Sequence, residues 1–532
     1  MTKIAVFLVG PPGCSKTLSL NLIKNEMKGI NSKSKFWKQY PQLFVTSFQG
    51  SITSTSHAIK QAFKKAQAHL NVWLEKKKKS EEKVNDELNG NDIISLVFID
   101  EIGLCEISPL NPLKVLHSFL ELDYKNKKNE EKIAFVGISN WRLDASKMNR
   151  GIYLNVFSPE SSKKDMINTA YEISKIYSKS FIADENNAKL LKILSEVVYK
   201  YKLKLNNEQD PNKNFHGTRD FYNLIKSVVR NITNKKDCNP INEVFFSIES
   251  NYNGLLKQNE CVSTRELEKE FIKNYPFENQ NNFNIFNIRQ LIGNNIIENE
   301  SRFLLLVTQS AISQYLIMHI LNEDNNDKEH IYYLGSLFEE DKFNEVYSTK
   351  VITKIKYYLE QPIILIFKNL STTYASLYDL FNQRFTYSLG KKYTEISIRD
   401  VTTSALVDDN LRIIVLITKE ALALQDPPFL NRFEKYVISY DSLLNQKEKD
   451  VAKKFFEIKN LFKLNEKLKI NPEYELINFS EDEIKGILFN SKSKNNETNL
   501  SYEDIILSKL SKTFPQELIA FINIYKKKNI MI

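Results

Sequence analysis

A glycine-containing loop near the start of the chain is the first feature that could do chemistry. It reads GPPGCSKT, Gly10 to Thr17, and lies between a short apolar run and a helical pattern. Glycines let a loop turn its backbone N–H groups onto phosphate oxygens, a lysine reaches the β- and γ-phosphates, and a hydroxyl ligates magnesium. The loop therefore predicts a site for ATP and Mg²⁺. Its cofactor-binding residues are expected to be Gly10, Pro11, Pro12, Gly13, Cys14, Ser15, Lys16, Thr17 and Leu18.

One position of this loop departs from the usual phosphate-loop pattern. Ser15 stands where the last glycine is usual. A small side chain is tolerated there, at some cost to phosphate affinity. Cys14 lies at a variable position of the loop, and we assign it no nucleophilic role.

Two consecutive carboxylates end the next strongly apolar segment. The segment, IISLVFIDE from Ile93 to Glu101, has the continuous apolar character of a strand buried on both faces. At its carboxyl end, Asp100 is placed to hold the magnesium shell, together with Thr17, and Glu101 to deprotonate an attacking water. The alternative is a surface strand that happens to end in two acids. The spacing from the loop, which suits an intervening helix, strand and helix, favours the catalytic interpretation.

Three further polar residues could act on phosphates. Asn140 follows an apolar strand, and is either a γ-phosphate sensor or a helix cap. Arg150 precedes the strand-like stretch 152–157, where it is a candidate arginine finger toward a neighbouring module. Arg219 lies in the sequence GTR before an amphipathic helix, and is either a lid arginine that contacts the γ-phosphate or an exposed helix-start residue.

The strand order repeats after residue 302 without the same chemistry. The second loop, TQSAISQY from Thr308 to Tyr315, has neither glycine nor lysine, and Lys368 and Asn369 stand in place of the two acids. We predict that this second module does not hydrolyse ATP. The repeated strands are expected at 303–307, 331–334, 362–367, 411–417 and 436–438.

The second module nevertheless contains a segment suited to the first site. FLNRFEK, Phe429 to Lys435, resembles the arginine-finger segment of several AAA+ unfoldases. In a tandem ring, a finger from the following module completes the preceding site, so Arg432 is predicted to stabilise transition-state charge at Lys16 and Glu101. The alternative is a surface arginine in a turn after two prolines.

Composition limits the remaining possibilities. A chain of 532 residues should hold about three or four compact units, and its net charge of +9 is too diffuse to predict a nucleic-acid partner. The four cysteines form no CxxC pair, which argues against a disulfide framework or a zinc site and favours a reducing, cytoplasmic location. The apolar stretch 303–321 is interrupted by polar residues, so we expect a strand and a helix there and no membrane span.

Longer strings point to a particular family. SFQGSITST (47–55), IDEIGLCEISPLNPLKVLHSFLE (99–121), VGISNWRLDASKMNRGIYL (136–154) and FHGTRDFYNLIK (215–226) resemble the mysterin family of giant RING-finger ATPases, and the similarity extends to about residue 440. The resemblance implies dynein-like tandem AAA+ modules in a single-chain ring, only some of them ATP-competent, with a ubiquitin-ligase portion elsewhere. Its expected partners are neighbouring AAA+ modules and proteins of the ubiquitin system.

The same resemblance predicts what this chain lacks. No cysteine follows Cys261, so a RING is not expected, and the chain is expected to be an excerpt of a longer protein or a truncated product. Met1 stands only three residues before the first strand, so part of the adenine pocket is expected to be missing.

The predicted fold is α/β, with two tandem P-loop AAA+ modules that each combine a parallel-sheet subdomain and a helical lid. The expected boundaries are 1–160 for the first α/β subdomain, 161–295 for its lid, 296–440 for the second α/β subdomain with a degenerate site, and 441–532 for a helical lid or tail.

Three functions are compatible with these features. The leading hypothesis is Mg·ATP hydrolysis by the first module of a motor core. The second is an ATP-binding scaffold with little turnover, which Ser15 favours. The third, a GTPase, rests on NKKD at Asn234 to Asp237, a sequence that resembles a guanine-specifying motif but follows a helix and lies far from the phosphate loop.

Overall fold

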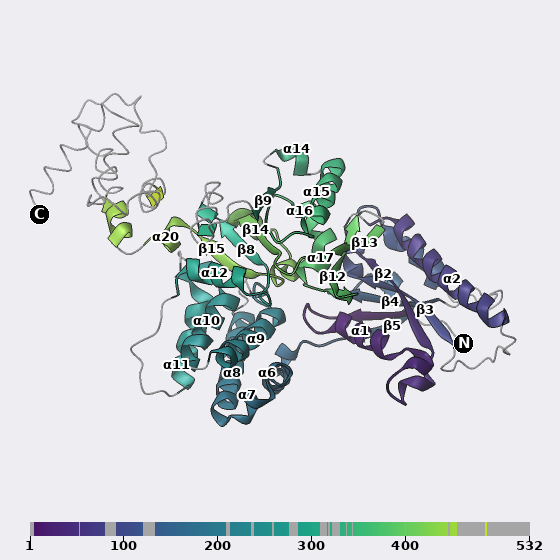
Figure 1. The fold of residues 1–532 in the computed structure, drawn as a ribbon, viewed down its shortest axis with the longest axis horizontal. Coiled ribbons are helices and arrows are strands. Elements are labelled where there is room, and N and C mark those ends of the chain that lie inside the picture. Colours follow the sequence, from purple (N-terminus) through teal and green to yellow (C-terminus); the bar gives the residue numbers. More distant parts are fainter. Residues whose placement is uncertain are drawn as a thin grey trace, which may run out of the picture.

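The computed structural model describes three bodies that follow one another along the chain (Figure 1). An α/β unit is followed by a group of helices and then by a second α/β unit. The described residues are 5–52, 54–79, 92–120, 133–208, 213–235, 239–257, 260–275, 286–308, 316–317, 320–321, 330–336, 338–342, 344–398, 401–444, 447–454 and 485–486.

The first unit is built on a five-stranded parallel sheet. Its order is β2-β3-β4-β1-β5, so the strand that leads into the phosphate loop lies between β4 and β5. The strands are β1 (Ala5–Val9), β2 (Gln42–Gln49), β3 (Ile93–Asp100), β4 (Ile133–Ser139) and β5 (Gly151–Asn155). The helices are α1 (Lys16–Glu26), α2 (Ser56–Lys79), α3 (Ile102–Glu106), α4 (Val115–Leu120) and α5 (Ala145–Met148).

Both faces of this sheet are covered, as the continuous apolar character of β3 requires. Side chains alternate between the faces of a strand. Val97 of β3 therefore belongs to the core cluster that contains Ile59 and Phe63 of α2, whereas Phe98 belongs to the cluster that contains Leu20 of α1. Because these strands are parallel, the carboxyl ends of β1, β3 and β4 lie at the same edge of the sheet. Helix α1 begins at this edge.

The helical body that follows has its own core. α9 is strongly amphipathic, and Phe221, Leu224 and Ile225 on its apolar face are fully buried. Its helices are α6 (Lys163–Tyr177), α7 (Lys179–Ala183), α8 (Glu185–Asn207), α9 (Thr218–Asn234), α10 (Pro240–Tyr252) and α11 (Val262–Asn274), with the short strands β6 (Leu256–Lys257) and β7 (Glu260–Cys261) after α10.

The second α/β unit repeats the topology of the first. Its sheet order, β15-β8-β14-β10-β9, is that of the first sheet read from the other edge, and all its pairs are parallel. All five predicted strands are present, with ends within about two residues of those expected: β8 (Leu304–Thr308), β9 (Ile331–Leu334), β10 (Ile364–Lys368), β14 (Arg412–Thr418) and β15 (Glu434–Ile438). Its helices are α12 (Ile288–Ile297), α14 (Glu339–Lys342), α15 (Glu345–Tyr358), α16 (Ser371–Tyr374), α17 (Tyr378–Phe381), α18 (Lys419–Leu422), α19 (Pro427–Leu430) and α20 (Tyr440–Leu443).

An antiparallel sheet between β10 and β14 was not predicted. It consists of β11 (Thr386–Ser388), β12 (Lys391–Ile398) and β13 (Val401–Leu406), none of which is among the strands expected for the second module. The turn that leads from α17 into β11 lies against the first module, as described below.

Some expectations lie outside the described residues. They include the second loop from residue 309 to 315, most of the tail after residue 454, and Lys236 and Asp237 of the NKKD sequence. Across the ranges that the structure does describe, no helix is long and apolar enough to span a bilayer.

Candidate nucleotide site

The phosphate loop has the backbone conformation that its sequence predicts. Gly13 has φ 87°, and Ser15 at the start of α1 has φ 63° and ψ 19°, in the left-handed region. A residue with a Cβ is strained there by about 1 to 2 kcal/mol, which explains why glycine is usual at the position of Ser15. A Cβ on Gly10 would lie 2.1 Å from the carbonyl oxygen of Val156, so that position requires glycine as well.

Lys16 lies within the loop and links it to the end of β4. Its ammonium donates to the carbonyl oxygens of Gly10 at 2.6 Å and Pro11 at 2.9 Å, and to Oδ1 of Asn140 at 3.0 Å. Burial lowers the pKa of Lys16 below its ordinary value. A buried ammonium whose partners are mostly neutral oxygens gains strongly from an anion, and this is the position at which P-loop lysines meet phosphate.

The two predicted carboxylates end β3 beside this lysine. The hydroxyl of Thr17 donates to Oδ2 of Asp100 at 3.2 Å, so the two predicted magnesium ligands are in contact. Glu101 has φ 52° and its Oε2 accepts from Nδ2 of Asn140 at 2.6 Å. Burial raises the pKa of Glu101 above its ordinary value, despite the opposing charge of Arg432.

Arg219 approaches the loop from the helical body. A Cβ on Gly13 would lie 3.5 Å from Cγ of Arg219, so the side chain of Arg219 runs along the loop. The hydroxyl of Tyr222 donates to the carbonyl of Gly13 at 3.1 Å. Burial, and then the nearby charge of Arg432, lower the pKa of Arg219 to about 10. Its Nη1 is buried and has no hydrogen-bond partner among the described residues. An orphaned cationic donor beside a phosphate loop fits a bound triphosphate.

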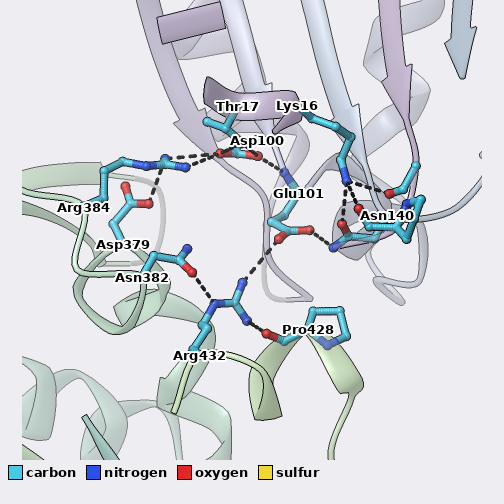
Figure 2. A network of polar contacts seen from close by, with 12 residues as sticks. Lys16, Thr17, Asp100, Glu101, Asn140, Asp379, Asn382, Arg384, Pro428 and Arg432 are labelled. Atoms are coloured by element: carbon cyan, nitrogen blue, oxygen red, sulfur yellow. Dashed lines mark hydrogen bonds and ion pairs between the residues drawn. The ribbon is translucent and has the colours of Figure 1, made fainter. Parts of the chain in front are cut away.

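Arg432 reaches the first module from the second, as Figure 2 shows. Its Nη2 lies 3.3 Å from Oε1 of Glu101, and the side chain is buried, not exposed in a turn as the alternative interpretation held. Its Nε donates to Asn382 at 2.9 Å, its Nη1 donates to the Pro428 carbonyl at 2.6 Å, and its guanidinium lies 3.7 Å from the ring centroid of Tyr378. Three contacts within the second module therefore fix the orientation of this arginine.

A second arginine from the same module was missed by the sequence analysis. Both terminal nitrogens of Arg384 donate to Oδ2 of Asp100 at 3.2 Å, and Nη1 also lies 2.9 Å from Oδ1 of Asp379 (Figure 2). The surrounding sequence FNQRF matches no motif. Only the contact across the module boundary, 284 positions along the chain, identifies the residue.

Arg150 and Leu18 lie apart from this network, whereas the sulfur of Cys14 contacts the ammonium of Lys16 at 3.7 Å. Arg150 donates from Nη1 to the carbonyl of Ser146 in its own module. Leu18 is 54% exposed, and the thiol of Cys14 donates to the Pro11 carbonyl at 2.9 Å, which makes Cys14 a loop-stabilising residue.

The second module keeps the backbone of the site without its chemistry. Asn369 follows β10 with φ 55°, as Glu101 follows β3 with φ 52°. Asparagine is among the residues that best tolerate the left-handed region of φ and ψ. The side-chain amide of Asn369 donates to the Ser336 carbonyl at 3.1 Å. Lys368 and Asn369 therefore occupy the positions of the two acids, and neither can ligate Mg²⁺ as a carboxylate does.

Comparison with known proteins agrees with this duplication. Two family models described as RNF213 AAA domain, the fourth and fifth of their series, match residues 1–163 and 293–444. The E3 ubiquitin-protein ligase rnf213-beta of Danio rerio is 30% identical over 82% of the chain, and the E3 ubiquitin-protein ligase RNF213 of Homo sapiens is 28% identical over 85%. The chain spans 8% of the length of each relative. The solved FIGL-1 AAA domain in complex with ADP covers 52% of the chain at 16% identity, with a TM-score of 0.25 that adds nothing to the assignment. Residues 1–163 and 293–444, together more than half of the chain, thus belong to the RNF213 (mysterin) AAA-domain family.

Proposed function

We propose that the first module binds and hydrolyses Mg·ATP, and that the second module does not hydrolyse ATP but supplies Arg432 to the first site. The observation that carries the proposal is one continuous chain of contacts: Lys16 to Asn140 at 3.0 Å, Asn140 to Glu101 at 2.6 Å, and Glu101 to Arg432 at 3.3 Å. It joins a phosphate-binding lysine, a sensor, a base and a finger across two modules.

Each residue has a defined task in this proposal. Lys16 and the loop N–H groups would hold the β- and γ-phosphates, and Thr17 and Asp100 would hold magnesium, which would supply neutralisation of the phosphate charge. Glu101 accepts the proton of the attacking water, and Asn140 orients both the base and the γ-phosphate. Arg219 and Arg432 are aligned to stabilise charge that develops on the transferred phosphoryl group.

The test compares the unmodified chain with two variants of the site. Glu101→Gln should bind a fluorescent ATP analogue with nearly unchanged affinity, whereas its steady-state turnover should fall by about 10²- to 10⁴-fold because the base is lost. Lys16→Ala should lose binding itself. Turnover of Glu101→Gln equal to that of the unmodified chain would remove Glu101 from its role.

A scaffold that binds ATP with little turnover is the second candidate. The left-handed conformation of Ser15 favours this candidate, because part of the free energy of ATP binding is then used to hold the loop in its strained conformation. ATP binding without turnover in the unmodified chain would support this candidate. Competition by GTP as effective as that by ATP would instead support the GTPase hypothesis.

The setting of the site in a longer protein is also part of the proposal. Because the relatives are named E3 ubiquitin-protein ligases, we place this pair of modules in a cytoplasmic, ligase-associated motor core in which neighbouring AAA+ modules and ubiquitin-system proteins are the partners. Hydrolysis at the first site would change the angle between the modules.

A further inference from the structure

Arg384 binds the carboxylate that the proposed function assigns to magnesium. Both terminal nitrogens share a single oxygen, Oδ2 of Asp100, and the same oxygen accepts from the hydroxyl of Thr17 at 3.2 Å. Arg384 therefore lies among the expected magnesium ligands, and it comes from a different module. Arg432 is separate from this contact, because it pairs with Glu101.

A guanidinium and Mg²⁺ compete for this oxygen, which already accepts from Arg384 and Thr17. Magnesium requires oxygen ligands at about 2.0 to 2.1 Å in near-octahedral order, and it repels a cation held against the same oxygen. The other oxygen, Oδ1, accepts from the N–H of Glu101 at 3.0 Å, so magnesium that binds Oδ2 should weaken the contact with Arg384.

Arg384 has a second partner that the displacement leaves in place. Oδ1 of Asp379 lies 2.9 Å from its Nη1, and Asp379 is buried on α17 of the same module. The backbone of Arg384 is also fixed, because its N–H donates to the Asp379 carbonyl at 2.9 Å. The side chain can consequently leave Asp100 while it remains neutralised at the module boundary.

We propose that Arg384 is a second trans-acting arginine of the first site, a positioning residue that competes with magnesium for Asp100. Before loading, it neutralises Asp100 and ties the second module to the first. When Mg·ATP binds, Arg384 leaves Asp100, keeps its contact with Asp379 and turns toward the added negative charge of the phosphates. Magnesium loading is thereby coupled to the contact between the modules. The inference rests on the proposed role of Asp100.

Linkage gives the consequence that can be measured. If magnesium breaks the contact between Arg384 and Asp100, the contact must weaken magnesium binding by the same factor. We measure the Mg²⁺ concentration that half-saturates the binding of a fluorescent ATP analogue to the whole chain. This half-saturating Mg²⁺ concentration should be lower in Arg384→Ala by at least about fivefold, because fivefold is the lower end of usual coupling factors. Lys391→Ala, an exposed cation at the start of β12, should leave it unchanged.

Two further variants separate the inference from the proposed function. Arg384→Lys keeps the charge but loses the guanidinium fork, so it should shift the half-saturating concentration in the same direction by a smaller factor. Asp100→Asn should abolish the magnesium dependence. If it does so while Arg384→Ala behaves like Lys391→Ala, the competition is wrong and the site assignment stands. If Asp100→Asn retains the full magnesium dependence, the assignment of Asp100 fails, and the inference fails with it.

Discussion

The carboxylate of Asp220 lies 2.9 Å from the ammonium of Lys435, and neither side chain has any exposed surface. Nη1 of Arg302 lies 2.8 Å from the same oxygen. Asp220 belongs to α9 of the helical body, whereas Lys435 is on β15 and Arg302 precedes β8 of the second module. Burial raises the pKa of Asp220, but Lys435 and Arg302 outweigh this effect and leave it well below its ordinary value. The cluster thus joins the two bodies through charges that must be paired.

This cluster also lies next in sequence to two of the site's arginines, Arg219 and Arg432. Asp220 follows Arg219, and Lys435 is three residues after Arg432. The side chain of Asp220 accepts from the N–H of Gly217 at 2.7 Å, so it caps the helix that presents Arg219. The segment 429–435 supplies one residue to the nucleotide site and another to the buried cluster.

Removal of the Asp220 charge should strongly destabilise this junction. Asp220→Asn leaves Lys435 and Arg302 without their shared counter-charge, and loss of one partner in a buried pair costs about 3 to 5 kcal/mol. The midpoint of thermal unfolding should fall by several degrees. Asp409→Asn, in which a 79%-exposed carboxylate is neutralised, is the matched control and should change little. Equal midpoints for the two variants would show that the cluster does not contribute to stability.

Acid should weaken the same region through His216. Burial, and then the nearby charge of Lys435, lower the pKa of His216 to about 3, and its ring nitrogen Nε2 lies 3.0 Å from the carbonyl oxygen of Asn253. The unfolded chain takes up a proton near pH 6.5 while the folded chain does not, so stability is complete above pH 6.5 and falls as the pH drops toward 3. At pH 5 the titration of His216 should lower the free energy of unfolding by about 2 kcal/mol.

The variant His216→Gln isolates that contribution. Glutamine can donate to the Asn253 carbonyl and does not titrate. Unfolding midpoints of both chains between pH 7.5 and pH 5 should show a smaller fall for the variant. Parallel pH profiles would mean that His216 is protonated in the folded protein as readily as in the unfolded chain.

Arg219 should stabilise the nucleotide complex and destabilise the free protein. Its Nη1 is buried without a hydrogen-bond partner among the described residues, and such a group costs about 1 to 3 kcal/mol. Arg219→Met should therefore melt no lower than the unmodified chain when nucleotide is absent. A hydrogen bond to a charged group contributes about 1.5 to 3 kcal/mol, so the ATP affinity of Arg219→Met should be lower by about 10- to 100-fold.

Arg142→Met is a suitable control for this experiment. The guanidinium carbon of Arg142 lies 5.2 Å from the ring centroid of Tyr153, and loss of this side chain should leave ATP affinity unchanged. Differential scanning fluorimetry with and without nucleotide measures both quantities. An Arg219→Met chain that keeps the full ATP-induced rise in melting temperature would exclude Arg219 from the site.

The sequence predicted the features that local patterns encode. The apolar strand before Asp100 and Glu101 follows from residue type alone, and the repeat of this strand at β10 was recognised although Lys368 and Asn369 replaced the acids. Arg432 was predicted because its neighbours in FLNRFEK form a recognisable segment. The alternation of Thr394, Ile396 and Ile398 with Glu395 and Ser397 in β12 is a strand signal that the sequence analysis missed.

Contacts between distant segments could not be predicted in this way. Arg384 and Asp100 are 284 positions apart, and Asp220 and Lys435 are 215 apart, so no periodicity or spacing relates them. Each contact depends on how the second module packs against the preceding bodies. The pattern of side chains within one element does not specify that packing. The sheet of β11 to β13 lies between β10 and β14, and the residues described between β3 and β4, the corresponding strands of the first module, include no such sheet.

The most direct test of the account is steady-state Mg·ATP hydrolysis by Arg432→Ala beside Arg150→Ala. The two arginines occupy equivalent positions, each between a short helix and the last strand of its sheet, but only Arg432 contacts Glu101. Loss of a finger in trans should reduce turnover by about 10³- to 10⁵-fold, with Arg432→Lys reduced as well, whereas Arg150→Ala should retain activity. Unchanged turnover in Arg432→Ala would contradict the claim that the second module completes the first site.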